Sequence, residues 1–162
     1  VFGIESGSDN ILKRMNKGFT AEQASQTLKN ASEAGIINMI CLIVGYPYET
    51  KQDVNQTGDF IRKNNKYIRY AQVYAFNLDH GSAIYHNPER YGIDNLTPVF
   101  ARFCFTFDEI EGLKWEQKQR QQMDSQRQIV KTIRINIRLK TFLFHFFTLF
   151  RLIAHKMKHY SS

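Results

Sequence analysis

The sequence predicts an α/β fold in which parallel strands form part of a TIM-like (β/α) barrel, followed by a helical C-terminal region. Apolar runs end near positions 5, 45 and 76, and this spacing of roughly 30 to 40 residues suits successive βαβ units. The run 36–44 is almost continuously apolar and β-branched, which is typical of a parallel strand covered on both faces. A complete barrel takes about 250 residues, so 162 residues suffice for part of one. An open doubly wound sheet is the competing arrangement.

The first elements follow from local signals. Residues 1–4 read as a buried strand, and residues 10–15 as a short helix. Thr20 with Gln23 three positions later is a capping-box pattern, so a second helix is expected to begin there. Gly35 stands where a helix C-terminal glycine belongs.

The next elements repeat this order. The strand 36–44 leads into a loop at 45–49, and Thr50 with Asp53 marks the start of a third helix. Residues 68–76 then read as a third strand.

The remainder of the chain is expected to be different. Residues 77–107 are rich in Gly, Pro, Asn and Asp and are predicted to be irregular. From Asp108 onward the polar composition suits a long helix, and the alternating stretch 132–140 is assigned to that helix as well. Two domains are therefore predicted, with bounds 1–107 and 108–162.

Charge separates the chain into two parts. Residues 1–112 carry 11 Lys/Arg and 13 Asp/Glu, whereas residues 113–162 carry 11 and 2. Such asymmetry indicates an anionic partner for the basic part, or else a solvated basic helix. The two cysteines, Cys41 and Cys104, form no disulfide or metal-ligand spacing, so no metal site is predicted and a reducing, cytoplasmic setting is favoured. Cys41 is expected to be a buried thiol.

The aromatic tail has two interpretations. Residues 141–154 are too short and too interrupted to span a bilayer, which takes about 20 apolar residues. They suit an interfacial helix that places the protein at the inner face of the membrane. The alternative, that the aromatics pack on the rest of the protein, is slightly favoured. Nucleic-acid binding is disfavoured, because the aromatics are clustered and apolar.

Polar residues follow each predicted strand. In parallel α/β folds, ligands bind where the carboxyl ends of the strands meet the following loops. Gly45 lets a flat ligand approach the backbone, and Glu5 can accept hydrogen bonds from an ammonium or from ribose hydroxyls. Glu49 could instead pin its own loop by binding main-chain amides. Ordinary turn formation explains the polar residues after any one strand end, which we call a strand exit. Three such exits together favour a ligand site.

These stretches, GIESGSDNILKRMNKG, IVGYPYET and VYAFNLDHGSAIY, resemble the radical S-adenosylmethionine (SAM) enzymes over about residues 1–95. The likeness is to the branch that often carries an N-terminal cobalamin-binding domain. In that family the stretches correspond to the fourth, fifth and sixth barrel strands with their loops. The resemblance implies that residues 1–107 are the C-terminal half of the barrel. It also implies SAM and a 4Fe–4S cluster as cofactors, with cobalamin in the full-length protein.

The resemblance also implies roles for individual residues. Glu5 and Ser6 would contact the amino-acid or ribose part of SAM, Ile43 and Gly45 would pack on adenine, and Glu49 would support that loop. The backbone from Tyr74 to Phe76 would meet the adenine edge, and Asn77 would face SAM or the substrate. The implied cofactor-binding set is thus Glu5, Ser6, Ile43, Gly45, Glu49, Tyr74, Phe76 and Asn77.

One departure from the family is clear. Its cluster-binding motif, Cys-x3-Cys-x2-Cys, is absent from the printed sequence. The chain is therefore expected to be a fragment that does not cleave SAM by itself. The intact protein would cleave SAM reductively and start radical chemistry, methyl transfer included, on a small-molecule or other substrate, with a reductant protein as partner. The alternative function is a non-catalytic binding module with a basic tail.

Overall fold

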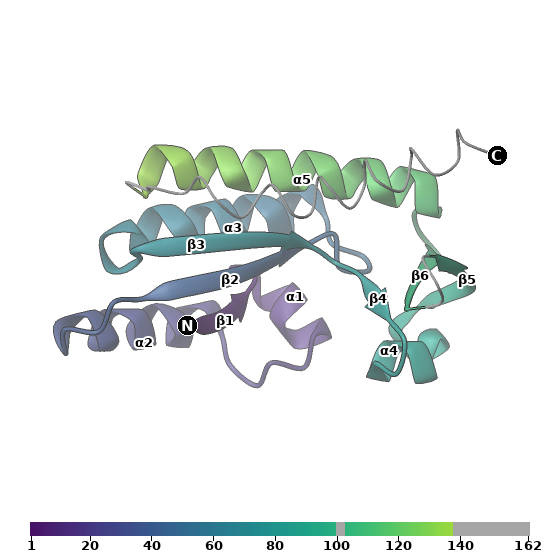
Figure 1. Ribbon diagram of the computed structural model, residues 1–162, viewed down its shortest axis with the longest axis horizontal. Coiled ribbons are helices and arrows are strands. Elements are labelled where there is room, and N and C mark those ends of the chain that lie inside the picture. Colours follow the sequence, from purple (N-terminus) through teal and green to yellow (C-terminus); the bar gives the residue numbers. More distant parts are fainter. Residues whose placement is uncertain (100–102, 138–162) are drawn as a thin grey trace.

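The parallel sheet predicted from the sequence is present. The computed structural model describes residues 1–99 and 103–137, and its first sheet has the strand order β1-β2-β3. The strands β1 (Phe2–Glu5), β2 (Met39–Val44) and β3 (Tyr70–Ala75) all run parallel (Figure 1). This confirms the α/β class with parallel strands. The three strands form an open sheet and do not close a barrel.

The helices of this lobe begin where the capping signals predict. Helix α1 spans Asp9–Arg14, α2 spans Ala21–Glu33 and α3 spans Lys51–Asn64, with a 3₁₀ turn at Asn65–Tyr67. The predicted capping box at Thr20 and the predicted helix start at Thr50 are confirmed. Both threonine side chains accept from the N3 amides, while the N3 side chains accept from the cap amides.

The two faces of the parallel sheet differ. Side chains of Ile40, Leu42 and Val73 are buried in a core shared with helices α2, α3 and α5 (Trp115–Asn136). The alternate side chains point to the other face, where Cys41 and Ile43 are half-buried and Tyr74 is 44% exposed. For the part of the chain that the structure describes, the predictions that β2 is covered on both faces and that Cys41 is buried are therefore wrong. Among residues 1–99 and 103–137, helices cover one face of the sheet, and we refer to the other as the open face.

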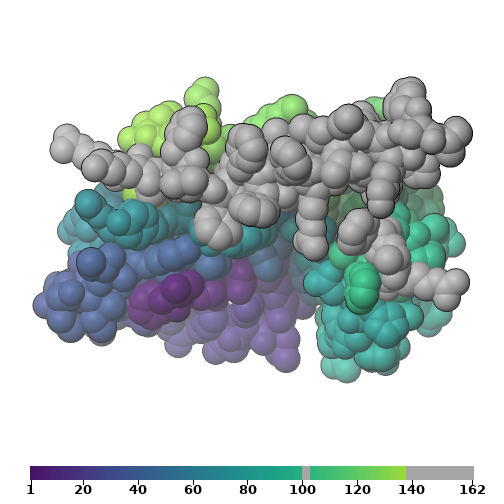
Figure 2. Space-filling model, viewed as in Figure 1, coloured from purple at the N-terminus to yellow at the C-terminus, as the bar shows by residue number. Residues whose placement is uncertain are grey.

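A second, antiparallel sheet follows. Residues 77–107 were predicted to be irregular, but they contain β4 (Leu78–Asp79), α4 (Ala83–His86), a 3₁₀ turn (Pro88–Tyr91), β5 (Ile93–Val99) and most of β6 (Cys104–Glu109). The strand order is β4-β6-β5. This sheet lies at the opposite end of the molecule from α2 (Figure 2). The strands escaped prediction because β5 has a register shift between Asp94 and Thr97 and contains Pro98.

Helix α5 returns to the first lobe and lies alongside α3 (Figure 1). It begins at Trp115 and not at Asp108, because Asp108 and Glu109 belong to β6. Residues 132–136 are helical as predicted. The aromatic tail at 141–154 and most of its basic residues lie outside the described residues, so the interfacial-helix prediction stays a prediction. Within 1–99 and 103–137, no helix is both long and apolar enough to cross a bilayer.

Candidate functional site

The three strand exits lie at one edge of the parallel sheet. Val44 pairs with Ala75 at the ends of β2 and β3, and Phe76 N donates to Val44 O at 2.8 Å. Glu5, the last residue of β1, lies opposite Leu42. The parallel register therefore brings Glu5, Gly45 and Phe76 to the same edge, as the sequence predicted.

Two residues at this edge have an unusual backbone conformation. Glu5 (φ 67°) and Tyr48 (φ 61°) lie in the left-handed region, which non-glycine residues other than Asn rarely adopt. Such strain persists where the surrounding structure enforces it, and it is frequent at ligand sites. The Glu5 carboxylate pairs with Lys17 at 3.0 Å, and a Cβ on Gly3 would come within 2.7 Å of Glu5 Oε1. Gly3 thus leaves room for the carboxylate on the open face.

Ser6 is held on the helix side of its loop. It is fully buried, its Oγ lies 3.1 Å from Thr57 Oγ1 of α3, and it accepts from Ser8 N. The Ser8 hydroxyl in turn donates to Asp53 at 2.5 Å. Burial opposes ionisation of Asp53, but hydrogen bonds from Ser8 and Thr50 lower its pKa below the usual value. The β1 exit is therefore fixed to α3 by buried polar groups.

Glu49 pins the loop after β2. Its carboxylate accepts from Gly45 N at 2.6 Å, and its side chain is almost fully buried. Burial raises the pKa of Glu49 to about 7, against the lowering effects of the Gly45 amide and Lys118. The expectation that Glu49 would bind a main-chain amide of its loop is confirmed.

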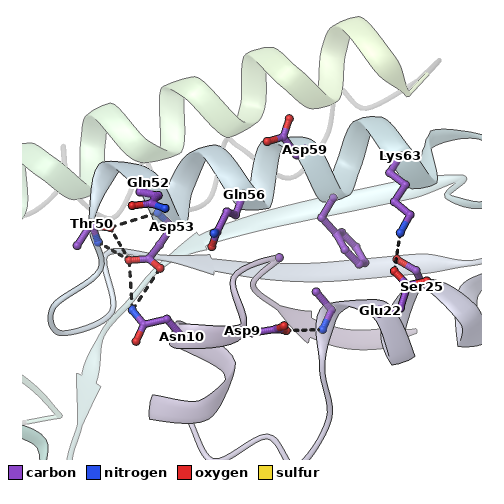
Figure 3. A pocket seen from close by; sticks show the side chains of 13 residues that line it. Asp9, Asn10, Glu22, Ser25, Thr50, Gln52, Asp53, Gln56, Asp59 and Lys63 are labelled. Carbon is purple, nitrogen blue, oxygen red and sulfur yellow. Dashed lines mark hydrogen bonds and ion pairs between the residues drawn. The ribbon is translucent and has the colours of Figure 1, made fainter.

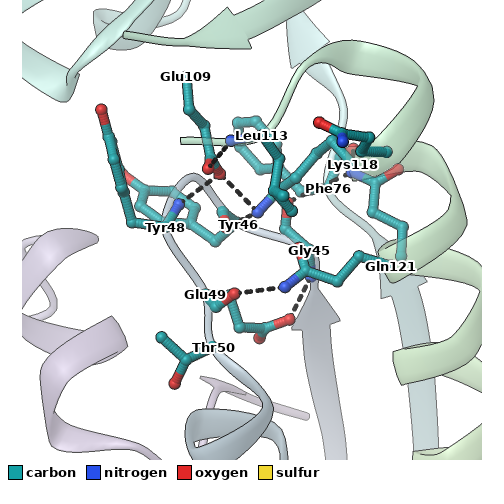
Figure 4. Close-up of polar contacts among 12 residues, drawn as sticks. Gly45, Tyr46, Tyr48, Glu49, Thr50, Phe76, Glu109, Leu113, Lys118 and Gln121 are labelled. Carbon is teal, nitrogen blue, oxygen red and sulfur yellow. Dashed lines mark hydrogen bonds and ion pairs between the residues drawn. The ribbon is translucent and has the colours of Figure 1, made fainter. Parts of the chain in front are cut away.

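A buried ion pair between β6 and α5 supports the same loop. Lys118 Nζ lies 2.8 Å from Glu109 Oε1, and the two side chains are 0% and 3% exposed. Lys118 also donates to Tyr46 O, and Glu109 accepts from Tyr48 N and Leu113 N (Figure 4). Burial lowers the pKa of Lys118. Burial alone would raise the pKa of Glu109, but the Lys118 hydrogen bond and the two amides lower it.

Two glutamines of α5 complete these contacts. Gln121 donates to Glu49 O at 2.6 Å, and Gln122 donates to Gly45 O at 3.3 Å and Phe76 O at 3.1 Å. We refer to Lys118, Gln121 and Gln122 as the α5 clamp. Sequence reasoning missed them, because Lys and Gln occupy many positions of α5 and the buried ones carry no distinguishing pattern.

The other predicted cofactor-binding residues have three different surroundings. Ile43 and Tyr74 are on the open face, where Tyr74 OH donates to Gln72 at 2.5 Å. The Phe76 ring packs between Tyr46 and Phe107, with centroids at 5.1 and 5.8 Å. Asn77 is exposed. The cofactor contacts assigned to these residues stay predictions.

A further groove lies elsewhere on the structure. It has a volume of about 690 Å³ and lies on the helix side, between α1, α2 and α3 (Figure 3). Several of its polar side chains are paired: Asn10 with Asp53, the Asp9 carboxylate with the main-chain amide of Ala21, and Lys63 with Glu22. These pairings hold α1 and α2 to each other and to α3, which gives this groove a structural role, so we place the candidate site at the strand exits.

Of the implied cofactors, the residues present fit SAM and do not fit the 4Fe–4S cluster. The acceptors at the exits, the Glu5 carboxylate and the carbonyls of Gly45 and Phe76, suit the ammonium, hydroxyl and amino donors of SAM. A 4Fe–4S cluster is held by cysteine thiolates, and Cys41 and Cys104 have no such spacing. Within the described parts of the chain, no three His, Cys, Asp or Glu side chains gather as a metal site.

The N-terminal part of the chain is similar to known proteins. Residues 1–61 match the Radical SAM superfamily. A protein of Methanocaldococcus jannaschii, provisionally named a methylthiotransferase, is 47% identical over 60 residues, which cover 37% of this chain and 13% of that protein. A tRNA-2-methylthio-N(6)-dimethylallyladenosine synthase of Desulfosudis oleivorans is 42% identical over 74 residues, covering 44% and 15%. A protein named an uncharacterized methyltransferase, from Pyrococcus horikoshii, is 39% identical over 71 residues, covering 44% and 15%.

Residues 1–61 are thus similar to radical SAM domains, and two of these relatives carry methylthiotransferase-type names. The matched segments span only 13–15% of the length of these three relatives. The resemblance seen in the sequence is confirmed at the level of the superfamily. The cobalamin-binding branch is not supported, since none of the three names refers to cobalamin.

Proposed function

We propose that this chain, whose residues 1–61 match the Radical SAM superfamily, supplies the SAM-binding edge of a protein that performs methylthio transfer. The observation that carries the proposal is the parallel register, which brings Glu5, Gly45 and Phe76 to one edge of the sheet. Cobalamin is not part of the proposal.

The proposed contacts follow the chemistry of the exits. Glu5, with a carboxylate on the open face, accepts from the ammonium or ribose hydroxyls of SAM. The Gly45 and Phe76 carbonyls accept from adenine, while Ile43 and Tyr74 form the open face of β2 and β3 beside them. Glu49 positions the Gly45 loop, and its hydrogen bond to Gly45 N supports that role.

The residues of this chain do not fit an iron–sulfur cluster, so we assign them no step of SAM cleavage. Their proposed task is to bind and orient SAM. The partners that accompany this function, a substrate and a protein that reduces the cluster, belong to the proposal for the whole protein.

Binding of S-adenosylhomocysteine (SAH) to the purified 162-residue chain tests this proposal. We expect SAH binding by calorimetry, and we expect Glu5→Gln to weaken it about tenfold, which corresponds to about 1.4 kcal/mol. Glu22→Gln is the matched control, because Glu22 is exposed, pairs with Lys63 and lies on α2. Absence of SAH binding, or equal affinity of wild type and Glu5→Gln, would contradict the proposal.

A further inference from the structure

The α5 clamp acts on main-chain carbonyls. Lys118 donates to Tyr46 O at 2.8 Å, Gln121 to Glu49 O at 2.6 Å, and Gln122 to both Gly45 O and Phe76 O. Gln122 is the member that joins the exits of β2 and β3. It is 6% exposed, so its contacts are made in the interior and not in competition with bulk water.

Gly45 has a shape that fits Gln122. Its φ is +78°, and a Cβ built on it would come within 2.0 Å of Gln122 Cγ. The glycine therefore admits the glutamine side chain on the helix side of the loop. The absence of a side chain at position 45 has a cause within this chain, independent of any ligand.

Which main-chain amides and carbonyls at the β2 and β3 exits are already hydrogen-bonded determines the kind of ligand group that can bind there. Gly45 N donates to Glu49, Tyr48 N to Glu109, Glu49 N to Tyr46 O, and Phe76 N to Val44 O. These four donors are used. A carbonyl oxygen has two lone pairs, and Gln122 uses one on each of its two acceptors. The second lone pair of the Gly45 and Phe76 carbonyls is left as an acceptor, which suits the 6-amino donor of adenine and disfavours the 6-keto acceptor of hypoxanthine.

Resting on the proposed function, we propose that Gln122 is a positioning residue for base recognition. It fixes the Gly45 and Phe76 carbonyls as acceptors for the amino group of an adenosyl ligand. Recognition of this kind depends on groups already held in place, because a polar site of fixed geometry discriminates strongly against a ligand that leaves it unpaired.

The test compares adenosine with inosine on the full chain. We expect the wild type to bind adenosine at least tenfold more tightly than inosine. Gln122→Met keeps the length of the side chain and removes its donor. We expect this variant to lose most of the preference, to below about threefold, and to bind adenosine and SAH each about tenfold more weakly.

Gln126→Met is the matched control. Gln126 lies one turn further along α5 and donates to Val73 O within β3 at 3.2 Å. A general structural role predicts equal effects of the two substitutions, whereas base recognition predicts that Gln126→Met keeps the adenosine preference. If thermal melting shows Gln122→Met unfolded, Gln122→Asn serves instead: the shorter amide cannot bridge both carbonyls, and we expect a reduced preference.

The outcomes separate the two proposals. Wild-type binding of SAH without an adenosine preference would overturn the role of Gln122 and leave the SAM-binding edge standing. An unchanged preference in Gln122→Met, or an equal loss in Gln126→Met, would overturn it too. A wild type that fails to bind SAH would contradict the proposed function, and the inference would fall with it.

Discussion

The exit of β1 and the exits of β2 and β3 lie at the same edge but are held in different ways. The β1 exit is fixed to α3 by hydroxyl and carboxylate groups, with Ser6 on Thr57 and Ser8 on Asp53. The other two exits are fixed to α5 by amides and by the buried Lys118–Glu109 ion pair.

This difference matters for how the family match is used. All partners of the β1 exit lie within residues 1–61, which match the Radical SAM superfamily. Glu49, which pins the β2 exit, lies within the match, but the other supporting side chains lie beyond it: Glu109, Lys118, Gln121 and Gln122. The part of the edge that faces adenine in our proposal is therefore held mostly by residues that the match does not cover.

The largest expected effect comes from breaking the support on the α5 side. Lys118→Met leaves Glu109 buried without its cation, which should lower the free energy of unfolding by about 4 kcal/mol in urea denaturation. Lys114→Met is the control on the same helix, because Lys114 pairs with Asp108 at the surface. Equal effects of the two substitutions would show that the buried pair carries no special role.

The second effect is a pH dependence that only the β2 exit should show. The pKa of Glu49 is raised to about 7 in the folded chain, so the folded state binds its proton more tightly than the unfolded state does. Its contribution is favourable at low pH and is lost as the pH rises through 7, by about 3 kcal/mol in all. Unfolding measured from pH 5 to 8.5 should show this decline. Glu49→Gln should flatten it, and an unchanged slope in that variant would contradict the assignment.

The third effect tests the steric fit between Gly45 and the Gln122 side chain. Gly45→Ala should lower the free energy of unfolding by about 2 kcal/mol, through the left-handed backbone and the displacement of Gln122. In a Gln122→Ala background the same change should cost about half as much, because only the backbone term remains. Additive effects in this double-mutant cycle would mean that the two residues do not interact.

The smallest effect belongs to the support on the α3 side. Asp53→Asn keeps one acceptor oxygen and loses the charge that Ser8 and Thr50 bind, so we expect a loss of about 1.5 kcal/mol. Asp59→Asn, at an exposed pair with Arg62, is the control. If Asp53→Asn lowered the free energy of unfolding more than Lys118→Met does, the α3 side would be the stronger of the two supports, contrary to this prediction.

Local signals made the first half of the fold predictable. The capping boxes at Thr20 and Thr50 need only four consecutive residues, and both are present. The apolar run at 36–44 gave the position of β2, although Ile36 and Ile37 are exposed and the strand begins at Met39. The shared edge followed from the parallel register alone.

The second half depended on contacts distant in sequence. The antiparallel strand β5 is irregular: its pairing with β6 shifts register between Asp94 and Thr97, and Asn95 takes a left-handed conformation. Gln122 donates to Phe76 O and Gly45 O, which are 46 and 77 positions away in the sequence. No pattern in a helix rich in Lys, Gln and Arg distinguishes the buried members of the α5 clamp from their exposed neighbours.

The central claim, that Glu5, Gly45 and Phe76 form one adenosyl-binding edge, is tested most directly by NMR of the ¹⁵N-labelled chain titrated with SAH. The account predicts the largest amide shift changes at residues 5–8, 45–48 and 76–77, with little change at 36–38 at the opposite end of the sheet. Shift changes concentrated in the groove between α2 and α3, or none at the three strand exits, would contradict it.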